Sequence, residues 1–76
     1  MELFSVCQYF KDGSYEYVRR NVRPEEAVRA FDHYVASVGA RMGLTTRVMI
    51  IDQGDCCNAE WVYGQGIVFP PPHDQD

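Results

Sequence analysis

Two adjacent cysteines, Cys56 and Cys57, are the most conspicuous residues with reactive side chains. Zinc sites use cysteines separated by two or more residues, because one ion must reach both sulfurs. Neighbouring residues of a strand point to opposite sides of a sheet. We therefore expect Cys57 to pack inward and Cys56 to face solvent, without a shared metal ion. Cys7 lies in an apolar segment and is expected to be a buried free thiol.

The other residues with catalytic or ligand chemistry give no recognisable site. A nucleophile–base pair would need Cys7 or Cys56 within hydrogen-bond reach of His33, and no spacing requires this. The Asp-Gln-Gly-Asp stretch at 52–55 lacks the alternating ligands and closing glutamate of a calcium loop, so we predict a turn. We expect no catalytic residue, no metal site, no cofactor and no enzymatic activity.

One basic cluster follows two tyrosines: Tyr15, Tyr17, Arg19, Arg20 and Arg23. Arginines beside aromatic rings can bind single-stranded nucleic acid through charge and stacking. The net charge of −4, however, argues against nucleic acid or an anionic membrane as the main partner. Nucleic-acid contact is therefore the alternative to protein binding.

Length and cysteine content favour one small domain in a reducing compartment. The 76 residues suffice for a single core, which we place at 1–69, followed by a Pro-rich acidic tail at 70–76. Three cysteines are an odd number, and the N-terminus lacks the basic and apolar regions of a signal peptide. We expect a cytoplasmic protein without a membrane span.

The elements that must position these residues are predicted from their patterns. Two strands, at 2–10 and 14–20, flank Asp12-Gly13, a strong signal for a hairpin. A helix is expected from Pro24 to Met42, ending at Gly43 or earlier at Gly39. Further strands are expected at 45–52 and 56–63, with a possible short edge strand at 67–69.

The helix should bury one apolar stripe. Val28, Phe31, Val35, Val38 and Met42 recur at spacings of three and four, and Ala27 and Tyr34 widen the stripe. The element order predicts an α+β fold of ββαββ type, with a four-stranded sheet and the helix on one face. The smallest β-grasp domains share this layout, in which the outer strands form a parallel centre. An antiparallel or ferredoxin-like sheet is the main alternative.

One helix covers only one face of such a sheet. A two-residue turn at Asp12-Gly13 would place Tyr15 opposite Phe10 and Arg19 opposite Val6. The first hairpin would then group Phe4, Val6, Phe10, Tyr15 and Tyr17 on one face, with Arg19 at its edge, and Leu3, Cys7, Tyr9 and Val18 on the other. Which face meets the helix depends on the register, because a shift of one residue exchanges the two.

Large exposed apolar patches usually mark interaction sites. We therefore expect a small protein-binding module that docks through Phe4, Phe10, Tyr15, Tyr17 and Arg19, either with itself as a homodimer or on a larger protein. A small acidic inhibitor of a host defence complex, as phages encode, is one version of this. The interface hypothesis would not apply if residues 67–72 folded over the face, or if the tyrosines were scattered on the surface.

Overall fold

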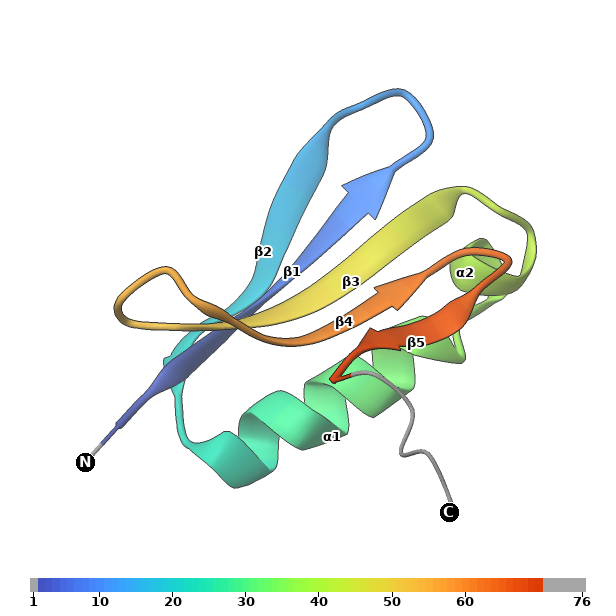
Figure 1. Cartoon of the computed structure of the whole chain (residues 1–76). Coiled ribbons are helices and arrows are strands. Elements are labelled where there is room, and N and C mark those ends of the chain that lie inside the picture. Colours follow the sequence, from blue (N-terminus) through green and yellow to red (C-terminus); the bar gives the residue numbers. More distant parts are fainter. Residues whose placement is uncertain (1, 71–76) are drawn as a thin grey trace, which may run out of the picture.

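The computed structural model describes residues 2–70 as a sheet with two helices (Figure 1). The strands are β1 (Phe4–Phe10), β2 (Tyr15–Val22), β3 (Thr45–Asp52), β4 (Cys57–Val62) and β5 (Gly66–Phe69), and the helices are α1 (Pro24–Val35) and α2 (Val38–Arg41). The α+β class is confirmed, and the suggested edge strand is present as β5. The predicted tail at 70–76 lies outside the described residues except for Pro70.

The sheet is antiparallel throughout, with the strand order β2-β1-β3-β4-β5. The parallel centre of a β-grasp layout was therefore wrong, and the antiparallel alternative is correct. The strand that follows α1 lies directly beside β1 and runs opposite to it. Short turns then add β4 and β5 one after the other, so the last strand ends at the far edge of the sheet (Figure 1).

The first hairpin closes with a longer turn than Asp12-Gly13 alone predicts. The N–H of Gly13 donates to the carbonyl of Phe10 at 2.9 Å, and the N–H of Phe10 donates to the carbonyl of Ser14 at 2.8 Å. Gly13 has a φ of 91°, as expected where a three-residue loop ends in a left-handed residue. Tyr15 therefore pairs with Tyr9 instead of Phe10, a shift of one residue.

The predicted helix from Pro24 to Met42 is divided into two. Ser37 interrupts it, because its hydroxyl donates to the carbonyl of Tyr34 at 2.8 Å and accepts from the N–H of Ala40 at 3.1 Å. Serine favours such caps over the interior of a helix. The helical region still ends where Gly43 adopts a φ of 80°.

The core lies between α1 and one face of the sheet. Its buried members are Val6, Ala27, Ala30, Phe31, Val48 and Ile50. Phe31 was correctly predicted and Val35 packs against the cluster, but Val28 and Val38 are 50% and 65% exposed. Ala27, Ala30 and Phe31 form the contact stripe of α1. The prediction included Ala27 and Phe31, but it placed the larger valines in the stripe and omitted Ala30. Val38 also lies beyond the break at Ser37, so it does not continue the same face.

Candidate functional site: an open sheet face

The face of the sheet opposite α1 carries a continuous set of side chains, which we call the open face. Its members are Cys7 and Tyr9 on β1, Tyr15, Tyr17 and Arg20 on β2, Arg47, Met49 and Ile51 on β3, and Glu60 on β4. Their strand neighbours Val6, Val48 and Ile50 point the other way, into the core against α1. Within residues 2–70, no helix or further strand packs over the open face.

Three tyrosine rings on the open face touch one another in sequence. The ring centroids of Tyr9 and Tyr15 are 5.5 Å apart, and those of Tyr15 and Tyr17 are 6.2 Å apart. The Cζ of Arg20 lies 4.2 Å from the centroid of Tyr17, and that of Arg47 lies 5.7 Å from Tyr9. We call these five residues the tyrosine–arginine ladder. Mutual ring and guanidinium contacts restrict the orientations of the side chains before any partner binds.

Cys7 lies beneath the ladder and is only 1% exposed, although its face has no covering layer. Its row across the sheet holds Tyr17 on one side and Met49 on the other. Burial raises the pKa of the Cys7 thiol above its ordinary value. The thiol is therefore protonated at neutral pH, and the centre of the open face is uncharged. The prediction of a buried free thiol is confirmed.

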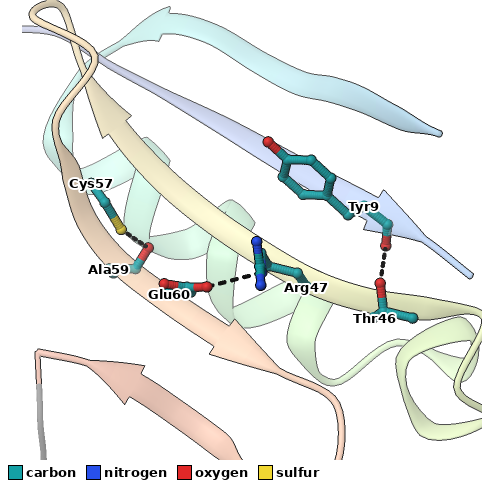
Figure 2. Close-up of polar contacts among 6 residues, drawn as sticks. All are labelled: Tyr9, Thr46, Arg47, Cys57, Ala59 and Glu60. Carbon is teal, nitrogen blue, oxygen red and sulfur yellow. Dashed lines mark hydrogen bonds and ion pairs between the residues drawn. The ribbon is translucent and has the colours of Figure 1, made fainter. Parts of the chain in front are cut away.

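The charges beside the ladder are partly neutralised within the face. The Nε of Arg47 lies 2.9 Å from a carboxylate oxygen of Glu60. Figure 2 shows this ion pair bridging β3 and β4, next to the ring of Tyr9 on β1. Arg20, at the other end of the ladder, rests on an aromatic ring instead of a carboxylate. The open face thus combines aromatic surface with Arg20 on the edge strand β2 and with the Arg47–Glu60 ion pair on the central strand β3 and its neighbour β4.

The structure divides the predicted interface set between the two faces. Tyr15 and Tyr17 lie on the open face, as the interface prediction requires. Phe4 instead packs against the core on the side of α1, and Phe10 shares a hollow with Leu44. Arg19 lies on the same side as α1, where its Nε is 3.3 Å from an oxygen of Glu26. These five residues therefore do not share one face.

Two local irregularities explain the division. The longer hairpin turn brings Tyr15 and Tyr17 opposite Tyr9 and Cys7, not Phe10 and Gln8. A β-bulge follows, because Val6 pairs with Arg19 while its neighbour Cys7 pairs with Tyr17, which leaves Val18 as an extra residue on β2. Arg19 consequently lies opposite Val6, as expected, while Arg20 returns to the open face.

Sequence reasoning missed most members of the open face. Cys7 and Tyr9 were assigned to the opposite face, and Arg47, Met49, Ile51 and Glu60 were not considered as site residues. The sequence pattern that could have revealed the residues of β3 is their spacing of two, which places Arg47, Met49 and Ile51 on one face. The nearly continuous apolar run of that strand obscured the pattern.

The basic cluster is also separated. Arg19 pairs with Glu26, and the Nε of Arg23 lies 3.8 Å from a carboxylate oxygen of Glu25, so both arginines are held by the first turn of α1. Of the three clustered arginines, Arg20 alone contacts a tyrosine of the open face. The structure adds Arg47 to this surface from β3.

The remaining candidates with reactive side chains stay apart. Cys56 is exposed and Cys57 is half-buried, as expected for neighbours that point in different directions. His33 is exposed on α1, with its ring edge-on to Tyr34. Among residues 2–70, no three His, Cys, Asp or Glu side chains lie close enough to hold a metal ion.

The predicted turn at 52–55 is confirmed and is organised by Asp52. One oxygen of its carboxylate accepts from the N–H groups of Gly54 at 2.8 Å and Cys56 at 3.0 Å, and the other accepts from the side-chain amide of Asn58 at 3.1 Å. These donors, first the N–H of Cys56, lower the pKa of Asp52. The carboxylate has a structural role in closing the loop between β3 and β4.

A second exposed apolar cluster surrounds α2, and we call it the α2-end cluster. Its members are Val38, Met42, Leu44 and Tyr63. A Cβ at Gly43 would lie 3.1 Å from the Tyr63 ring, so this ring rests on the turn after α2. The sequence did not predict this cluster, because Val38 and Met42 were assigned to the helix stripe.

Within residues 2–70, no helix combines the length and apolar character needed to cross a membrane. Comparison of the chain with protein-family models, with curated proteins and with solved structures finds no match.

Proposed function

We propose that this chain is a non-enzymatic protein-binding module that docks through its open face. The observation that carries the proposal is the uncovered face of a five-stranded sheet, on which the rings of Tyr9, Tyr15 and Tyr17 contact one another and are bracketed by two arginines. Tyrosine, arginine and methionine are enriched in protein interfaces. The open face has these residue types, with Met49 on its central strand.

Rigidity favours the open face over the α2-end cluster as the docking surface. Its side chains project from adjacent strands that are hydrogen-bonded to one another, and the rings already touch. Pre-ordered side chains lose less conformational entropy on binding. The α2-end cluster lies on a four-residue helix and the following turn, so its side chains have less support.

A pair of matched variants tests the proposal. Tyr15→Ser with Tyr17→Ser removes two rings of the ladder, whereas Val38→Ser with Met42→Ser removes similar apolar area from the α2-end cluster. Each variant and the wild type are used as tagged bait in the native host, and circular dichroism checks their fold. We expect specific protein partners to be lost from the tyrosine variant and kept by the control. Equal retention by both variants would contradict docking through the open face.

Single-stranded nucleic acid is the second candidate, because aromatic rings flanked by guanidinium groups can also bind bases. The contact of Arg20 with Tyr17 favours nucleic-acid binding. Arg19 and Arg23 pair with carboxylates of α1, which argues against it. A fluorescent oligothymidine titration at rising salt distinguishes the candidates, since binding through phosphates weakens steeply with salt. Salt-sensitive binding that disappears in the tyrosine variant would replace the protein-binding proposal.

A further inference from the structure

We propose that the occupant of the open face is a second copy of this chain, with two sheets packed face to face about a twofold axis. This inference rests on the proposed function, since it uses the same face and adds the identity of the partner. A twofold interface must be self-complementary, because the same patch is used by both copies. The open face meets this requirement when the axis runs parallel to the strands, between β1 and β3.

The cross-strand register fixes which residues would meet. One row across the sheet is Tyr17, Cys7, Met49 and Glu60, and the next is Tyr15, Tyr9, Arg47 and Val62. The proposed axis places β1 over β3 of the second copy, and β2 over β4 of the second copy, at the same level. Met49 of the second copy then lies over the tyrosine rings that cover Cys7, and Tyr17 meets Glu60 of the second copy.

The contacts made in this arrangement are chemically matched. At the level of Cys7, the Met49 thioether and the tyrosine rings above the protonated thiol form an uncharged contact beside the axis. Tyr9 meets Arg47 of the second copy, which repeats between chains the guanidinium–ring contact found within one chain. The Tyr17 hydroxyl can donate to the carboxylate of Glu60 of the second copy, so a polar group that becomes buried keeps a hydrogen-bond partner.

Opposite charges on the open face favour a second copy as its occupant. Arg20 lies on the ring of Tyr17 on β2, and Glu60 lies on β4, with two strands between them in one chain. The proposed axis brings Arg20 beside Glu60 of the second copy. Symmetry repeats this contact, so each dimer has two pairs of opposite charge. Reversing the charge of either residue therefore creates two repulsive contacts in the homodimer of that variant.

A charge-exchange experiment tests the arrangement. Arg20→Glu should place Glu beside Glu60, and Glu60→Arg should place Arg beside Arg20, so each variant alone should dimerise at least about tenfold more weakly than the wild type. An equimolar mixture should recover the dimer, because each variant supplies the charge that the other lacks. Sedimentation velocity measures the association, and circular dichroism checks the fold. If Glu60→Arg fails to fold, Arg20→Glu with Glu60→Gln should recover part of the dimer.

A wild type that stays monomeric at high concentration would overturn the dimer. So would a dimer that both single variants retain, or a mixture of variants that remains monomeric. None of these results would refute docking on a different protein, which the tyrosine and α2-end variants test separately. Loss of the dimer in the tyrosine variant, together with its recovery in the charge-exchanged mixture, supports both proposals.

Discussion

The guanidinium of Arg20 stacks on the ring of Tyr17, with 4.2 Å between Cζ and the ring centroid. The preceding residue, Arg19, lies on the opposite side of the sheet and pairs with Glu26 of α1. The β-bulge on β2 separates these two neighbours by placing Arg19 opposite Val6. Consecutive arginines therefore belong to different surfaces, which provides a matched pair of substitutions.

We expect Arg20→Ala to weaken association through the open face by about 2 kcal/mol, roughly thirtyfold in Kd, because truncation of an arginine that contacts a partner can cost this much. Arg19→Ala should leave association unchanged and cost about 1 kcal/mol of folding stability or less, because its ion pair is exposed. Sedimentation equilibrium and urea unfolding measure the two effects. Equal loss of association in both variants would contradict the assignment of faces.

The core assignment predicts a strong contrast between two residues of α1. Phe31 is 4% exposed and lies in the core, whereas Val28 is half exposed. Phe31→Ala should cost about 3–5 kcal/mol, while Val28→Ala should cost about 1 kcal/mol or less. A domain of this size has about 5–10 kcal/mol in total, so the Phe31 variant should be close to unfolding. Denaturant titrations check both values, and comparable costs would contradict the orientation of α1.

The sequence predicted the succession of the first four strands and the helix along the chain, and the burial of a single face of the sheet by a helix. Turn signals at Asp12-Gly13 and at 52–55, together with Pro24 at the start of α1, sufficed for that. The hairpin register could not be predicted, because an Asp-Gly pair fits both a two-residue turn and the end of a three-residue loop. This difference of one residue moved Tyr9 onto the face of Tyr15.

The strand order and the rotation of α1 were also beyond the sequence. The parallel centre was taken from element order, which leaves open whether β3 or β4 lies beside β1. The stripe of α1 was centred on valines, but close approach of a helix to a sheet favours small residues such as Ala27. The open face joins Tyr9 with Arg47, which are 38 positions apart in the sequence, so only the β1–β3 pairing reveals their contact.

The loop between β3 and β4 should respond to acid through Asp52. Its folded pKa is lowered, so its contribution to stability is present above the pKa of an unfolded aspartate and is lost as pH falls through the folded value. We expect Asp52→Asn to be less stable than the wild type at neutral pH. An uncharged Asn side chain accepts hydrogen bonds from the three donors less well than the carboxylate does. The gap should close at low pH. A gap in the free energy of unfolding that is independent of pH would contradict this.

The cysteines should differ in reactivity. Cys56 is exposed, whereas Cys7 is buried. The raised pKa of Cys7 keeps the reactive thiolate fraction of this residue small. Iodoacetamide at mildly alkaline pH should modify Cys56 early, and should reach Cys7 only after denaturant unfolds the chain. Peptide mass spectrometry at timed intervals measures both. Modification of Cys7 at the rate of Cys56 in the folded protein would show that the ladder does not shield it.

Hydroxyl-radical footprinting of two tyrosines tests directly whether the protein docks through the open face. Tyr15 is 59% exposed on the open face, and Tyr63 is 48% exposed in the α2-end cluster, so each serves as the control for the other. The protein is labelled when dilute, and again when it is concentrated or bound to a partner from its host. We expect the oxidation of Tyr15 to fall on association while that of Tyr63 is unchanged. Protection of Tyr63 with full oxidation of Tyr15 would contradict it.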